Sequence, residues 1–215
     1  MFKAAVFIPQ PEIIDIITIN IFPLASRMLM LSEEPVQGEG VDALLNLCKT
    51  YIPKAQSKNL VMKVIQVIMD RIRASNEHQE TEEIREKAKI AVLIIVQKFS
   101  EADIFEKEEC DIFLENYITE VKDGMGFKIK RFLLPALISV SKQLDYSAFI
   151  NNVYSLFKTF CNDEVWGVRK ACIEHMDKLV KHLKHEDATK FEECFEFFKR
   201  CLTDSNRWVK NQALV

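Results

Sequence analysis

Three histidines near the end of one expected helix have the spacing that comes closest to metal-binding chemistry in this chain. His182 and His185 are three residues apart, which places both rings on one helix face, and His175 precedes them. A metal site would also need acidic or thiol partners, and the nearest acids, Glu186 and Asp187, fall in a solvated turn. The pattern favours a polar helix end that complements the helix dipole, so we expect no metal and no cofactor.

Motifs for catalysis are missing from the sequence. It contains no glycine-rich phosphate loop, no HExxH and no GxSxG, and no Ser or Cys has a base beside it. The six cysteines are dispersed without a CxxC pair, which predicts reduced thiols in a cytoplasmic or nuclear protein. The net charge of −3 argues against general binding to a nucleic-acid backbone. We therefore expect a protein that is not an enzyme and that binds neither nucleic acid nor a membrane.

A different set of residues recurs along the chain. In Asp163–Arg169 and again in Asp204–Lys210, an Asp is followed five residues later by Val and then by a cation, at an offset of 41 residues. Upstream, Asp123 precedes Ile129-Lys130-Arg131, 39 residues before the Val168 phrase, and Ile84-Arg85 is a weaker echo. Self-similarity at about 40 residues between helical segments is typical of HEAT repeats, in which an A helix and a B helix form each repeat.

The elements that must position these residues are helices. The chain has only 5 Gly and 6 Pro, which suits long helices joined by short turns. We predict an all-α HEAT-repeat solenoid, a right-handed superhelix of about five antiparallel helix pairs. We expect residues 1–215 to form a single array. We also expect this array to be a fragment of a longer solenoid, because no polar capping repeat closes its end. Helices are expected at 11–31 (kinked by Pro23), 41–52, 57–74, 82–100, 106–122, 128–143, 147–161, 164–183, 188–203 and from 206, with a loop near 32–40.

Apolar residues at helical spacing predict which faces are buried. One stripe in 164–183 and a second in 188–203 recur every three or four residues. We expect near-complete burial of Val168, Cys172, Met176, Phe195 and Phe198. On this basis Phe195→Ala would cost about 3–5 kcal/mol. The apolar segment 13–31 is expected to be a buried end helix rather than a membrane span, because it contains charged residues.

The recurring phrase has a physical rationale. An Asp in the turn before helix B can accept backbone N–H bonds, and the cation after the Val can pair with the turn carboxylate of a neighbouring repeat. The predicted ladder consists of Asp123, Lys130, Asp163, Arg169, Asp204 and Lys210. Both tryptophans, Trp166 and Trp208, fall in these turns. They either pack between adjacent turns or contact a partner, since Trp and Arg are enriched in interface hot spots.

The phrase around Trp166, followed by Asp204–Lys210, resembles the HEAT-repeat regulatory subunit 1 family of protein phosphatase 4 and, more loosely, the scaffold subunit of protein phosphatase 2A. The close resemblance covers about 160–215; Gln212 and Lys210 depart from the usual pattern. It implies a non-catalytic subunit that holds a phosphatase catalytic subunit and directs it to substrates. The alternative is a transport factor of the importin kind or another interaction scaffold. The resemblance implies partner binding by Asp163, Trp166, Arg169, Arg207, Trp208 and Lys210.

Overall fold

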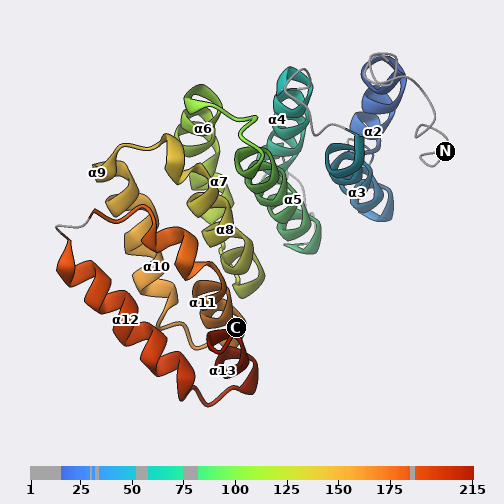
Figure 1. Cartoon of the computed structure of the whole chain (residues 1–215). Helices are drawn as coiled ribbons and strands as arrows, with labels where there is room; N and C mark the ends of the chain where they lie inside the picture. Colours follow the sequence, from blue (N-terminus) through green and yellow to red (C-terminus); the bar gives the residue numbers. More distant parts are fainter. Residues whose placement is uncertain (1–15, 30, 32–33, 52–57, 75–81, 185–186) are drawn as a thin grey trace. The chain divides into compact units, whose positions relative to one another are not determined.

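The protein is described by a computed structural model at residues 16–29, 31, 34–51, 58–74, 82–184 and 187–215. Every regular element in these residues is a helix, which confirms the predicted all-α fold (Figure 1). The chain divides into two compact units, unit 1 at Met1–Val121 and unit 2 at Lys122–Val215. Each unit is described by itself below.

Unit 1 consists of helix pairs. A π-helical turn η2 (Ile17–Ile21) leads into α2 (Phe22–Leu29), which packs against α3 (Glu34–Tyr51). Next come α4 (Lys58–Ala74) and α5 (Glu82–Glu101), which pack against each other, and α5 also packs against α3. The last A helix is built from α6 (Lys107–Ile112), η4 (Phe113–Tyr117) and α7 (Ile118–Lys122).

The loop expected near 32–40 is wrong from Glu34 onward, because α3 begins there. Pro35 occupies the second helical position, where a missing N–H costs little. Gly40 lies where α3 approaches α2: a Cβ there would meet Leu29 N at 3.2 Å and Ala25 O at 3.3 Å. Its small size therefore serves helix packing and does not break the helix.

The first expected segment is helical from residue 16, and its predicted start at 11–15 lies outside the described residues. Pro23, expected to kink this helix, lies where η2 passes into α2. Among the described residues, no helix combines the length and apolar character needed to cross a membrane.

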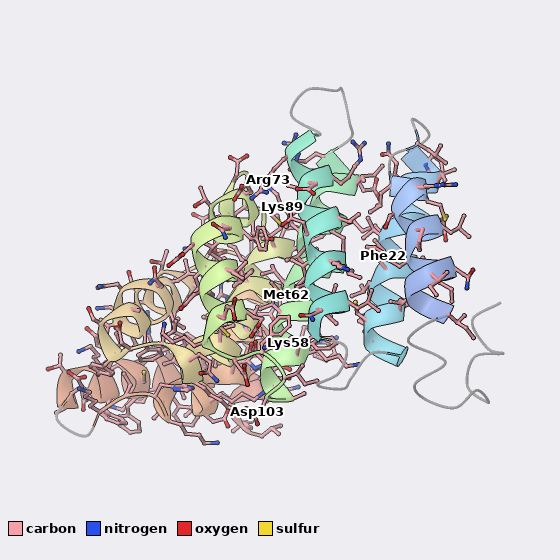
Figure 2. The ribbon with its side chains drawn as sticks, turned by 90° about the horizontal axis from the view of Figure 1, so that it is seen from above. Phe22, Lys58, Met62, Arg73, Lys89 and Asp103 are labelled. Carbon is pink, nitrogen blue, oxygen red and sulfur yellow. The ribbon has the colours of Figure 1, made fainter. Side chains whose placement is uncertain are left out.

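Ion pairs join neighbouring A helices of unit 1 at both ends of α4. Figure 2 labels Lys58 and Arg73 at these ends. Lys58 Nζ lies 2.9 Å from a carboxylate oxygen of Glu109, and Arg73 Nη2 lies 2.9 Å from Glu120. Glu109 also closes a capping box with Glu106 at the start of α6. The contacts fix the register of α4 against the helix that follows α5.

Unit 2 contains the strongest form of the repeat. The B helix α8 (Phe127–Val140) ends in a short 3-10 turn, η5 (Ser141–Gln143). An A helix follows, built from α9 (Tyr146–Ala148), η6 (Phe149–Tyr154) and α10 (Ser155–Phe160). The next elements are α11 (Trp166–Val180), the A helix α12 (Ala188–Leu202) and the B helix α13 (Arg207–Ala213). The B helix α11 packs against α8 on one side and α13 on the other.

The repeat offset seen in the sequence corresponds to structural equivalence. Ile84, Ile129, Val168 and Val209 are each the third residue of a B helix, and all four are buried. The first turn of each B helix therefore presents equivalent positions.

The predicted burial of Val168 and Cys172 in α11 is confirmed. For α12, the prediction chose the wrong face of the helix. Phe195 is 52% exposed, whereas Phe197, two residues on, is buried. Met176 and Phe198 are half-buried. The buried stripe of α12 is Cys194, Phe197 and Cys201, because the ring of Phe197 packs edge-on against Phe157 of α10, with centroids 5.7 Å apart.

Candidate functional site

The candidate site is the edge of unit 2 formed by the turns that precede the B helices. Asp163 and Asp204 lie in two equivalent turns, and each carboxylate orders its own turn by accepting a backbone N–H two residues on. Asp163 Oδ1 accepts from Val165 N at 2.9 Å, and Asp204 Oδ1 accepts from Asn206 N at 2.8 Å. The turn carboxylates therefore accept backbone N–H bonds, as expected, but they form Asx turns just before the helix, and Val165 occupies the N-cap position of α11.

Each carboxylate also meets the cation of the preceding B helix. Lys130 Nζ of α8 lies 2.6 Å from Asp163 Oδ2. Arg169 of α11 forms a bidentate pair with Asp204, through Nε at 2.8 Å and Nη2 at 3.0 Å. Because each pair joins one repeat to the next, the two pairs are rungs between successive repeats.

The Arg169 guanidinium group donates hydrogen bonds both to its own turn and to the next turn. Its Nη1 donates to the carbonyl oxygens of Asp163 and Glu164 in its own turn, at 2.7 and 2.9 Å. Its remaining donors face Asp204 in the next turn. Lys130 adds a cation–π contact, with its Nζ 5.9 Å from the centroid of Phe160. These contacts place Arg169 and Lys130 in internal packing.

The electrostatics follow from these contacts. The hydrogen bond from Arg169 lowers the pKa of Asp204 against the effect of burial, with the Asn206 N–H and the charge of Lys210 acting in the same direction. Burial raises the pKa of Asp163, but the bonds from Lys130 and Val165 N outweigh it and leave the pKa below its usual value. Both carboxylates are thus held as anions.

The remaining ladder residues are Lys210, in the first turn of α13, and Asp123, in the turn before α8. Lys210 follows the buried Val209 and lies close enough to Asp204 to affect its pKa, within the same repeat. Asp123 lies exposed in the turn before α8. The structure therefore brings together Lys130 with Asp163, and Arg169 and Lys210 with Asp204.

Aromatic side chains project from the same edge. Trp166 is the first residue of α11 and is 41% exposed; Trp208 is the second residue of α13 and is 48% exposed. Arg207 lies over the Trp208 ring, with its guanidinium carbon 4.8 Å from the centroid. The two tryptophans share equivalent turns but not equivalent positions.

A third aromatic residue, which the sequence reasoning missed, completes the series. Phe127 is the first residue of α8, as Trp166 is of α11, and it is 46% exposed. The signal was available, because Phe127 precedes Trp166 by the 39-residue offset that relates Ile129 to Val168. Arg131 of α8 reaches across to α11, where a Cβ on Gly167 would meet its Cδ at 3.3 Å. We name Phe127, Arg131, Trp166, Arg207 and Trp208 the turn row.

The residues considered for metal and thiol chemistry are placed elsewhere. Burial and the charge of Lys142 lower the pKa of His182, whose ring lies 5.6 Å from that of Phe149. His185 and Glu186 lie outside the described residues. In the part of the chain that the structure describes, no group of three or more His, Cys, Asp or Glu could hold a metal ion.

All six cysteines are buried free thiols. Burial raises the pKa of Cys194 to about 11 and that of Cys201 to about 12. A thiol reacts through its thiolate, so these side chains act as core residues.

Comparison with known proteins supports the fold class. No family model matches the chain, and no curated protein matches it. Among solved structures, a designed armadillo repeat protein in complex with the peptide (KR)4 has a TM-score of 0.50 at 16% identity, covering 94% of this chain and 83% of that one. An engineered protein has a TM-score of 0.50 at 12% identity, covering 91% and 78%. The chain therefore has an armadillo-type helical-repeat fold.

Proposed function

We propose that this protein is a non-catalytic interaction scaffold and, more specifically, a regulatory or scaffold subunit that holds the catalytic subunit of a serine/threonine phosphatase of the protein phosphatase 4 or 2A type. The observation that carries the proposal is the turn row, in which three exposed aromatic rings occupy three successive turns. Soluble surfaces rarely display large aromatic side chains in a series without a binding role.

Along this edge the charged side chains contact neighbouring repeats, whereas the aromatic rings are exposed, which supports docking by the aromatic residues. Arg169 and Asp163 have their polar atoms turned toward neighbouring repeats, so their proposed role is the inter-repeat ladder. Trp166 and Trp208 remain available to a partner, as exposed rings on a rigid framework. Such rings bury large area at small entropic cost, which makes them frequent hot spots. The docking residues are thus Trp166, Trp208 and Arg207, joined by Phe127 and Arg131.

The specific phosphatase assignment rests on the sequence resemblance at 160–215. The fold class supports protein binding in general, since the designed armadillo repeat protein of similar fold is in complex with a peptide. That peptide is basic, whereas the turn row carries Arg131 and Arg207. The cationic row favours a partner surface that offers carboxylates beside apolar pockets.

The test is direct binding to a purified phosphatase catalytic subunit of either type, measured by calorimetry. The double variant Trp166→Ala/Trp208→Ala should weaken binding by about 2 kcal/mol, close to 30-fold in Kd. The matched control is Leu24→Ala, which removes an apolar side chain of similar exposure from α2, outside the turn row. Melting temperatures should stay near that of the unaltered protein, because these rings are exposed.

The outcomes separate the parts of the proposal. If the unaltered protein binds neither catalytic subunit, the phosphatase assignment is refuted. If binding is found and the folded double variant binds equally well, the turn row is the wrong surface. Capture of a small GTPase with nucleoporins would instead indicate the transport-factor alternative.

A further inference from the structure

The helix α12 carries a second apolar stripe that packing among the described residues leaves partly exposed. Phe195 is 52% exposed and Leu202 is 37% exposed, while Phe191 and Phe198 are half-buried. These four residues are spaced by four, three and four positions, so they share one face of the helix. This outer stripe is separate from the buried Cys194, Phe197 and Cys201, and it lies outside the turn row.

The internal repeat shows what such a face does. At the 41-residue offset that relates Asp163 to Asp204, the outer-stripe residues Phe195, Phe198 and Leu202 correspond to Tyr154, Phe157 and Cys161 of the preceding repeat. Those three residues are buried, and α12 covers them. The Tyr154 hydroxyl bonds Glu193 at 2.6 Å, and Phe157 packs edge-on against Phe197. The outer stripe is therefore the repeat of a face that binds an amphipathic helix.

The stripe is complementary to itself when reversed. A spacing of four, three and four reads the same in both directions, so antiparallel pairing of two α12 helices sets Phe191 opposite Leu202 and Phe195 opposite Phe198. Side chains beside the stripe have the matching polarity. Glu192 and Glu196 precede its centre, and Lys199 follows it on the same flank.

An antiparallel two-fold axis keeps the same flank of both helices on one side. Lys199 of one copy then falls between Glu192 and Glu196 of the other, whereas a parallel two-fold would place the two charged flanks on opposite sides of the contact, where they could not pair. In the single chain Lys199 Nζ lies 2.5 Å from Glu196 Oε1 and 4.4 Å from the centroid of Phe195. The cation already lies at the rim of the stripe where the second copy would meet it.

We propose that the outer stripe of α12 is a homodimer interface, in which a second copy of this chain packs its own α12 antiparallel across a two-fold axis. The interface goes beyond the scaffold function, since it would hold two turn rows in one assembly. A 15-residue helix is about 22 Å long, so the contact is small and the dimer is a weak one that depends on concentration.

Sedimentation velocity of the whole chain from about 1 to 200 μM tests the proposal, a range that spans weak dimers. The mass should rise from 25.0 kDa toward twice that value. Phe195→Asp should raise the dissociation constant at least tenfold, an order of magnitude typical of a central interface residue. Trp208→Asp, which alters an exposed ring of the turn row, is the matched control and should leave association unchanged.

Charge exchange tests the antiparallel arrangement without touching the apolar stripe. Lys199→Glu alone and Glu192→Lys/Glu196→Lys alone should each weaken self-association, and mixing the two proteins should restore it as a heterodimer. A mass that stays at 25.0 kDa throughout the range would overturn the proposal. So would association that is lost in Trp208→Asp but kept in folded Phe195→Asp, because the contact would then lie on the turn row.

Discussion

Removal of the Arg169 side-chain charge should destabilise unit 2 selectively. Arg169→Met keeps most of the aliphatic stem and removes both bonds to Asp204, along with the two bonds to carbonyl oxygens of the preceding turn. The side chains of Arg169 and Asp204 are only 18% and 11% exposed, so solvent screening of the pair is limited. The variant leaves a half-buried carboxylate with the Asn206 N–H and the charge of Lys210 as its remaining support.

The expected loss follows from these contacts. Hydrogen bonds to charged groups contribute about 1.5–3 kcal/mol each, and breaking a buried pair by removing one partner costs about 3–5 kcal/mol. Since this pair is partly exposed, we expect a loss of about 2–4 kcal/mol in the free energy of unfolding. The adjacent Lys170→Met removes an exposed pair with Glu174 and should cost no more than about 0.5 kcal/mol.

The assay exploits the position of the tryptophans. The chain has 2 Trp, Trp166 and Trp208, and both belong to unit 2, so urea unfolding followed by tryptophan fluorescence reports on that unit. A double-mutant cycle of Arg169→Met with Asp204→Asn should give a coupling energy of about 1–3 kcal/mol. A loss below about 0.5 kcal/mol for Arg169→Met, or a coupling energy near zero, would refute the ladder as a stabilising device.

Two further predictions concern the same unit. Phe197→Ala should lower the free energy of unfolding in urea by about 3–5 kcal/mol, because it empties a buried site. Phe195→Ala should lower it by less than about 1 kcal/mol, because the Phe195 ring is exposed. A larger loss for Phe195→Ala than for Phe197→Ala would show that the face of α12 predicted from the sequence is the buried one. The pKa values of Asp163 and Asp204 are lowered in the folded state, so their contribution to stability is present above the usual aspartate pKa near 3.9 and is lost as the pH falls below it. Stability should therefore decline between about pH 5 and pH 2, and Asp204→Asn should make that decline shallower.

The B helices could be predicted well from sequence because one short phrase marks their starts. The Asp, the apolar residue and the cation each have a local role, in the turn, the core and the flank. Ile129, Val168 and Val209 therefore occupy equivalent buried positions, as their spacing indicated. Phe127 was missed because an aromatic residue beside a short basic run does not by itself indicate a binding site. Its position becomes informative only when the 39-residue offset aligns it with Trp166.

The phase of α12 was not predictable from periodicity, because the helix has two apolar stripes at helical spacing. Phe195 and Phe198 outweigh Cys194 in hydrophobic area, yet the face that packs is chosen by Phe157 on α10. The glycines of α3 misled for a related reason. Gly40 is a residue type common in turns, but here it allows α3 to approach Ala25 and Leu29 of the neighbouring helix α2 closely, a packing role that local composition does not reveal.

The placement of the rungs has a mechanical consequence for unit 2. Lys130–Asp163 and Arg169–Asp204 tie successive repeats where the B helices begin, with short directional bonds that resist sliding. Bonds of this kind hold the starts of neighbouring B helices at a fixed separation. When the stack of unit 2 bends, the edge that carries the aromatic rings of the turn row should therefore keep its spacing.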